Sequence, residues 1–118
     1  MSSYSNYVNQ ATALAQNLTY AHGNTLILRA DHTTAIPATS LVGRNSVRIK
    51  SIKTYTTHVA VFDVRHMPQG CGTWPAIWEA QENGWPAGGE VDIVEGVNNI
   101  GPNRCVSIIL TRLFHSTS

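Results

Sequence analysis

Three carboxylates stand close together in the run GGEVDIVEG, residues Gly88–Gly96: Glu90, Asp92 and Glu95. The valines and isoleucine between them favour a strand, in which every second side chain points to the same face. Glu90 and Asp92 therefore share a face, whereas strict alternation would send Glu95 to the other. A β-bulge adds one residue to a strand and often lies beside an active site. We predict a bulge at Ile93–Val94, which places all three acids on one face.

Carboxylates crowded in this way suit the hydrolysis of glycosidic bonds. That reaction needs one carboxylate as a nucleophile and one carboxylic acid that donates and later accepts a proton. With the bulge absorbed, the Cα atoms of Glu90 and Glu95 lie roughly 13 Å apart. Side chains that lean together bring the carboxyl groups to on the order of 5 Å, near the separation in retaining enzymes. Because no lysine or arginine lies within the run, crowding helps one glutamate to keep its proton near neutral pH.

Three tryptophans precede the acids: Trp74, Trp78 and Trp85. An indole face offers contact area to the C–H face of a sugar ring, and its N–H can donate to a hydroxyl. Core packing is the commoner role of a single tryptophan. Trp85 lies in a Gly/Pro-rich loop, where core burial is less natural, so it is the best substrate-binding candidate. Of Trp74 and Trp78, we expect one to line a cleft and one to support the core, and we favour Trp74 for the cleft.

Two other interpretations of the acidic run stay open. A solvated acidic edge strand would carry the same residues without any chemistry. A divalent-metal site at Glu90, Asp92 and Glu95 is the other, because hard cations accept clustered carboxylates. The metal interpretation leaves the nearby tryptophans unexplained. Loss of function on adding a chelator would favour it.

Together with GCGTWPAIW upstream, residues 70–78, the acidic run resembles glycoside hydrolase family 16. Within that family the chain is similar to the fungal laminarinase-like endo-β-1,3(4)-glucanases, almost throughout residues 43–98 and roughly over residues 7–103. The resemblance implies an all-β fold, a β-jelly-roll sandwich of the concanavalin A-like type with a concave glucan-binding face. It also implies retaining hydrolysis of β-1,3 or mixed β-1,3/1,4 linkages.

The resemblance assigns roles to residues of the run. Glu90 matches the family's nucleophile, Glu95 its general acid/base, and Asp92 the assisting carboxylate between them. Trp85 resembles a position that stacks on sugar beside the nucleophile. A non-catalytic glucan-binding module that uses the same face is the alternative, although a pure binder has no need for three crowded acids. Binding without turnover would support that alternative.

Asn45 and Arg65 are secondary substrate-binding candidates. Asn45 stands at a loop-to-strand junction, where it resembles a family asparagine that can meet a sugar hydroxyl. Arg65 could pair with a carboxylate of the site. An ordinary surface salt bridge is the alternative for Arg65.

Composition and net charge limit which partners and which cellular location we expect for the protein. Of its 118 residues 42% are hydrophobic and 13% charged, a balance that suits a β-rich secreted protein. A net charge of +1 is too small to predict binding to nucleic acid or to a membrane. The resemblance implies β-glucan as the partner, and we expect a monomer. No cofactor and no catalytic metal are expected. The resemblance implies secretion, although the N-terminus lacks the features of a signal peptide.

Hydrophobic periodicity predicts the elements of the chain. We expect strands over residues 25–31, 45–51 and 55–67 and a loop over residues 32–43. Residues 13–20 have the composition of a short helix, although the resemblance places strand and loop there. The histidines in this part, His58 and His66, are interpreted as ordinary polar positions on a strand, because they lack the spacing and partners of a metal site.

Three regions are expected along the chain. Residues 1–5 form a disordered lead-in, residues 6–103 a partial catalytic domain, and residues 104–118 a divergent tail that could continue as a strand. A sandwich enzyme often has about 200–250 residues, so we expect the domain to be truncated after about its first half, poorly folded alone and nearly inactive. Cys71 and Cys105 could form one disulfide or none, and we favour none.

Overall fold

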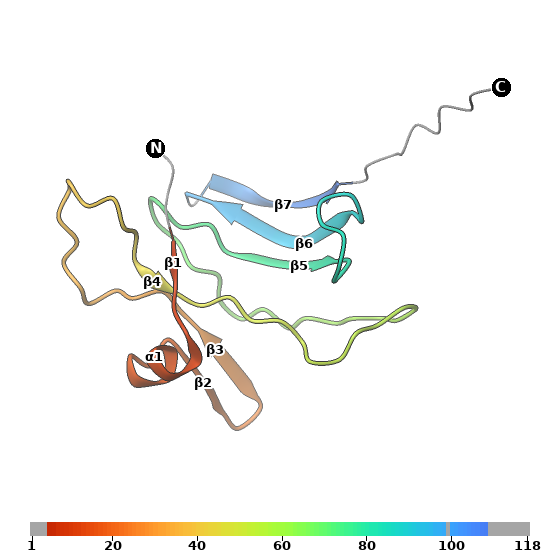
Figure 1. Ribbon diagram of the computed structural model, residues 1–118, viewed down its shortest axis with the longest axis horizontal. Helices are drawn as coiled ribbons and strands as arrows, with labels where there is room; N and C mark the ends of the chain where they lie inside the picture. The colour runs from red at the N-terminus through yellow and green to blue at the C-terminus, as the bar shows by residue number, and fades with distance from the viewer. Residues whose placement is uncertain (1–4, 99, 109–118) are drawn as a thin grey trace. The chain divides into compact units, whose positions relative to one another are not determined.

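The structure is a computed structural model that describes residues 5–98 and 100–108, traced in Figure 1. The chain divides into two compact units, Met1–Lys53 and Thr54–Ser118. Residues 1–4 of the predicted lead-in and residues 109–118 of the predicted tail lie outside the described residues. Within the described part, no helix has the length and apolar character needed to cross a membrane.

Short paired strands build the first unit. Strand β1 (Asn6–Tyr7) pairs in parallel with β4 (Asn45–Ser46), and β2 (Thr19–His22) pairs antiparallel with β3 (Thr25–Leu28). Gly23 turns the β2–β3 hairpin at a φ of 58°, a conformation that glycine adopts without steric cost. The unit is therefore held by a local hairpin and by one long-range pair of strands.

Helix α1 (Gln10–Ala15) lies between β1 and β2. The side chain of Asn9 caps it by accepting a hydrogen bond from the Thr12 backbone N–H at 2.9 Å, which satisfies one of the free donors of the first turn. Ala13 and Leu18 are the buried apolar side chains of the described residues. The short helix suggested by the composition of residues 13–20 is present but lies earlier, at Gln10–Ala15, and the strand that the resemblance places in that stretch covers Thr19–His22.

The second unit contains a three-stranded antiparallel sheet with β6 in the middle (Figure 1). Its strands are β5 (Ala76–Ala80), β6 (Glu90–Val97) and β7 (Ile100–Ile108). Strand β7 takes up residues 104–108, so the described start of the predicted tail does continue as a strand. Cys71 and Cys105 are both free and exposed in the structure.

The two long strands predicted over residues 45–51 and 55–67 were wrong in extent. Of the first, Asn45 and Ser46 form strand, and no strand is assigned within the second. Alternation gives a segment an amphipathic surface, but a strand also needs a neighbour for its N–H and C=O groups. Along residues 55–67 the side chain of Val59 stays 91% exposed.

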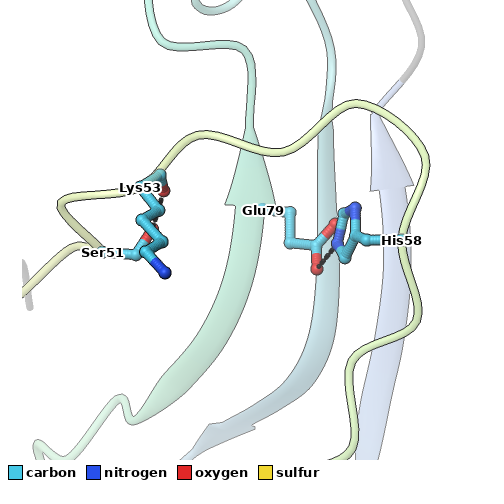
Figure 2. A network of polar contacts seen from close by, with 4 residues as sticks. All are labelled: Ser51, Lys53, His58 and Glu79. Carbon is cyan, nitrogen blue, oxygen red and sulfur yellow. Dashed lines mark hydrogen bonds and ion pairs between the residues drawn. The ribbon is translucent and has the colours of Figure 1, made fainter.

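A polar contact ties this irregular segment to the sheet. His58 Nε2 lies 3.0 Å from Glu79 Oε1 of β5, and Figure 2 shows the two side chains pointing toward one another. The His58 ring also lies 5.2 Å from the Tyr55 ring, centroid to centroid. The interpretation of His58 as an ordinary strand position was therefore wrong, because the residue anchors a loop.

Asp31 organises the loop that follows β3. Its Oδ1 accepts hydrogen bonds from the Thr33 N–H at 2.9 Å, the Thr33 hydroxyl at 3.0 Å and the Thr34 N–H at 3.1 Å. Arg44 Nη1 donates to the Thr34 carbonyl at 2.9 Å and closes the loop from its far end. The Thr34 hydroxyl, followed by the Thr33 N–H, holds the pKa of the buried Asp31 carboxyl well below its usual range.

Loss of the Asp31 carboxylate is expected to destabilise the first unit in a pH-dependent way. Because its pKa is lowered in the folded state, its contribution is present above the ordinary aspartate value of about 3.9 and is lost as the pH falls toward the lowered value. Asp31→Ala should therefore lower the melting temperature at neutral pH, and the difference should shrink in acid. Thermal unfolding followed by circular dichroism measures both.

The matched control is Asp63→Ala, which removes a carboxylate whose side chain is 84% exposed. It should leave the melting temperature nearly unchanged, because exposed ion pairs contribute little. Equal melting temperatures for Asp31→Ala and the unsubstituted chain at neutral pH would contradict the structural role of Asp31.

Candidate active site

A register shift between β5 and β6 lines up the three acids. From Ile77 to Trp78 of β5, the partner on β6 changes from Val94 to Asp92, so the pairing skips Ile93. The acids pair with alternate residues of β5: Glu90 with Ala80, Asp92 with Trp78, and Glu95 with Ala76. Alternate residues of a strand face the same way, so the acids share one face. The β-bulge predicted at Ile93–Val94 is confirmed.

The other side of β6 is irregular at the same place. Its pairing with β7 shifts between Asp92 and Glu95, which oppose Val106 and Arg104. Three steps along β6 therefore correspond to two along β7, which is again one extra residue on the central strand. The extra residue is thus accommodated by both neighbours of β6, and the acids keep their common face across the whole sheet.

Asp92 is the most deeply buried of the three acids. Its side chain is 5% exposed, whereas Glu90 and Glu95 are half-buried. Burial, followed by the negative charges of Glu95 and Glu90, raises the pKa of the Asp92 carboxyl. The sequence predicted that crowding would help a glutamate to keep its proton. The structure identifies Asp92 as the member on which crowding and burial act together.

Each glutamate accepts a hydrogen bond from one tryptophan. Trp85 Nε1 donates to Glu90 Oε2 at 2.6 Å, and Trp74 Nε1 donates to Glu95 Oε1 at 2.7 Å. The two rings are 62% and 63% exposed, so most of each indole surface is open to solvent. Both tryptophans that the sequence selected as substrate-binding candidates therefore lie against the acids, although by their N–H edges.

Backbone pairing places Trp74 beside Glu95. The residues on either side of Trp74 are bonded to the end of β6: the Asn98 N–H donates to the Thr73 carbonyl at 3.0 Å, and the Gly96 N–H donates to the Pro75 carbonyl at 3.1 Å. These two bonds hold the segment before β5 in line with the strand that carries Glu95. The indole edge can then reach across to the carboxylate.

A tight loop places Trp85 beside Glu90. The Gly88 N–H donates to the Gly84 carbonyl at 2.6 Å, which closes the loop around Trp85. The Gln81 side chain lies so close to Gly88 that a Cβ atom there would clash with it. Gly84 has a φ of 150°, which side-chain-bearing residues rarely adopt. The glycines of this run therefore allow the loop to turn back toward the start of β6.

Trp78 also belongs to the face that carries the acids. It is half-buried and pairs with Asp92 across the β5–β6 ladder. The sequence analysis favoured Trp74 for the cleft and left core support to Trp78; Trp74 is 63% exposed and bonded to Glu95, whereas Trp78 is the less exposed of the two. Alternation along β5 was the available signal, because Ala76, Trp78 and Ala80 share one face and pair with the three acids.

The secondary candidates have other polar partners. Asn45 lies in the first unit, where its side chain accepts from Asn6 Nδ2 at 2.7 Å and donates to Gln16 Oε1 at 2.9 Å. Arg65 Nε lies 3.8 Å from Asp63 Oδ2, and both side chains are mostly exposed. The Arg65 contact is the surface salt bridge that the sequence analysis held as the alternative. Through these hydrogen bonds Asn45, a residue of β4, links β1 to the end of α1.

The metal-site interpretation finds no support in the arrangement of ligands. Across residues 5–98 and 100–108, no group of three or more histidine, cysteine, aspartate or glutamate side chains is placed to hold a metal ion. Glu90 and Glu95 instead each accept one indole N–H, and the charges of both act on Asp92.

Comparison with known proteins identifies the family. The sequence model of the XgeA-like catalytic domain of glycoside hydrolase family 16 matches residues 2–108. The chain belongs to glycoside hydrolase family 16. An endo-1,3(4)-β-glucanase of Arthroderma benhamiae is 45% identical over 96 residues, which cover 80% of this chain and 20% of the relative. A probable endo-1,3(4)-β-glucanase of Aspergillus niger is 44% identical over 102 residues, which cover 85% and 14%.

Solved structures of the family agree with the fold. Laminarinase 16A from Phanerochaete chrysosporium, with β-glucans in its donor and acceptor sites, matches with a TM-score of 0.80 and 73% identity over 87% of this chain. The match confirms the predicted resemblance to laminarinase-like members of family 16 and the all-β, jelly-roll class. The chain spans 34% of that laminarinase chain, so its sheet corresponds to part of the jelly-roll domain.

The raised pKa of Asp92 predicts a pH-dependent effect of replacing it. A raised pKa means that the folded state prefers the protonated acid, so stability is lost as the pH rises from the ordinary aspartate value of about 3.9 through the raised value. Asp92→Asn mimics the protonated form at every pH. It should raise the melting temperature at neutral pH and change it little at about pH 3.

Thermal unfolding across that pH range tests this prediction, with Asp63→Asn as the control at an exposed carboxylate. The control should melt like the unsubstituted chain at both ends of the range. A lower melting temperature for Asp92→Asn at neutral pH would contradict the prediction, because it would mean that the ionised carboxylate stabilises the fold.

Proposed function

We propose that this chain carries the catalytic carboxylates of a retaining hydrolase of β-1,3(4)-glucan. The observation that supports the proposal best is the bulge that brings Glu90, Asp92 and Glu95 to one face of the sheet. Membership of family 16 and similarity to endo-1,3(4)-β-glucanases give the reaction class and the substrate. A pair of carboxyl groups on one face is what retaining hydrolysis requires.

Glu90 acts as the nucleophile in the first step. One of its carboxylate oxygens forms a bond to the anomeric carbon while the bond from that carbon to the glycosidic oxygen breaks. Glu95 donates its proton to the departing oxygen, so the leaving sugar ends with a hydroxyl group. The products of this step are a glycosyl ester of Glu90 and an ionised Glu95.

Water completes the reaction in the second step. The Glu95 carboxylate accepts a proton from a water molecule whose oxygen bonds to the anomeric carbon. The ester bond to Glu90 breaks, and its electron pair returns to the carboxylate. Two inversions at the anomeric carbon retain the β configuration, and both glutamates regain their starting protonation states.

Asp92 assists both glutamates from between them. When it is ionised, its charge helps to hold the proton on Glu95, and when it is protonated it can donate to a neighbouring carboxylate and orient Glu90. Its burial supports this role, because charges in a poorly solvated position interact more strongly than charges in water. The residue is an assisting group and forms no bond to the substrate.

The exposed tryptophans offer surfaces for the sugar. Trp85, beside Glu90, is proposed to stack on the ring next to the cleaved bond, and Trp74 to line the cleft beside Glu95. Asn45 and Arg65 remain candidates for contacts with sugar hydroxyls. The proposed partner is an uncharged β-glucan, and the proposed setting is that of a secreted monomer without a cofactor.

A chimaera tests whether these residues are catalytic. Residues 6–108 of this chain would replace the matching segment of laminarinase 16A, which supplies the remainder of a family 16 domain. We expect the chimaera to release reducing ends from laminarin, and Glu90→Gln to lower that rate by about a thousandfold or more, as expected when a nucleophile is removed. The assay compares initial rates at equal concentrations of folded protein.

Glu79→Gln is the matched control in the chimaera. Glu79 pairs with Val91, so it lies on the face of the sheet opposite the acids. Glutamine keeps an oxygen that can accept a hydrogen bond from His58, so the contact that anchors residues 55–67 can persist in this control. A chimaera that binds laminarin without hydrolysing it would favour a binding module instead. Equal hydrolysis rates for the Glu90→Gln and Glu79→Gln chimaeras would show that Glu90 is not the nucleophile.

A further inference from the structure

We propose that Trp74 and Trp85 are positioning residues that assign the two oxygens of each glutamate to different tasks. In this assignment, Oε2 of Glu95 exchanges the proton and Oε1 of Glu90 attacks the sugar, while the remaining oxygens stay bonded to the indole N–H groups. The inference rests on the roles proposed for the two glutamates. It adds a function for the tryptophans that differs from stacking on sugar.

The geometry gives each glutamate its own donor. Trp85 Nε1 lies 2.6 Å from Glu90 Oε2, and Trp74 Nε1 lies 2.7 Å from Glu95 Oε1. The donors come from opposite sides of β5 in the sequence, Trp74 from the segment before it and Trp85 from the loop after it. Two independent backbone arrangements therefore produce the same contact, one at each glutamate.

The donor chemistry indicates which oxygen of Glu95 carries the proton. An indole N–H donates and never accepts, so it needs a lone pair on the oxygen that it contacts. The hydroxyl oxygen of a protonated carboxyl group also has lone pairs, but the carbonyl oxygen is the stronger acceptor. With Oε1 held by Trp74, the proton therefore favours Oε2. The Oε2–H bond breaks when the proton passes to the leaving oxygen, and it forms again from water, while the Trp74 contact persists throughout.

The same reasoning separates the two oxygens of Glu90. With Oε2 held by Trp85, Oε1 forms the bond to the anomeric carbon. Oε2 then becomes the carbonyl oxygen of the ester and still accepts the indole N–H, because a carbonyl oxygen keeps its lone pairs. The contact can therefore persist in the free enzyme and in the intermediate, and it keeps the carboxyl group from rotating between the two steps.

An edge contact and a stacking contact use different parts of the ring. Each indole N–H donates a hydrogen bond to a glutamate. Trp85 is nevertheless 62% exposed and Trp74 63% exposed, so the faces of their rings stay available to a sugar. One tryptophan can thus align a carboxylate with its edge and meet the substrate with its face. The two functions are separable by substitution, because phenylalanine keeps an aromatic face and lacks the N–H.

Nuclear magnetic resonance of the indole N–H groups tests the assignment in the full chain, whether or not that chain hydrolyses glucan. The chain has three tryptophans and so three indole signals, which Trp74→Phe and Trp85→Phe identify by removing one signal each. Glu95→Gln replaces the charged acceptor by a neutral one and should move the Trp74 signal upfield while the Trp85 signal stays in place. Glu90→Gln should do the reverse.

A pH titration then tests the separation of the two oxygens. If the proton binds the oxygen that the indole leaves free, the Trp74 N–H signal should shift on acidification but stay distinct from that of free tryptophan. Both glutamine variants moving the same signal, or neither moving any, would overturn the proposal. So would collapse of the Trp74 signal onto the free-tryptophan position when the carboxyl group is protonated.

These outcomes are independent of the proposed hydrolase activity. An inactive chimaera together with reciprocal indole shifts would leave the positioning contacts in place and reject the enzymatic role. An active chimaera without reciprocal shifts would keep the enzyme and reject the contacts.

Discussion

The β-bulge at Ile93 is the constraint on which the candidate site depends. In an unbroken strand Glu90 and Asp92 would share one face and Glu95 would point to the other. One skipped residue turns Glu95 back, so that Ala80, Trp78 and Ala76 of β5 oppose the three acids in order. The same irregularity appears against β7, which means that the central strand itself carries the extra residue.

Bringing three acids together has an electrostatic cost that the fold distributes unevenly. Asp92 lies deepest, and its pKa rises because burial and both neighbouring charges disfavour its ionised form. Glu90 and Glu95 are half-buried and each accepts an indole N–H, which offsets part of the mutual repulsion. A cluster that served stability alone would gain nothing from this arrangement, whereas the acid–base chemistry that we propose for it would use the arrangement directly.

Local features of the sequence predicted the bulge in β6 better than they predicted the extent of the strands over residues 45–51 and 55–67. The bulge was readable because Ile93 and Val94 break an alternation that the acids require. The strand expected over residues 55–67 was wrong because pairing depends on a neighbour that no local pattern supplies. The indole contacts could not be predicted from the sequence either. Spacing shows that Trp74 and Trp85 precede the acids, but it does not show which edge of each ring contacts a carboxylate.

The most direct test of this account is the register of β5 against β6, measured by nuclear Overhauser contacts between backbone protons of the two strands. The bulge predicts that Ala76 lies opposite Glu95 and Trp78 opposite Asp92, with Ile93 skipped. A regular ladder would instead place Ala76 opposite Val94. Contacts between Ala76 and Glu95 would establish the common face of the three acids, and contacts between Ala76 and Val94 would contradict it.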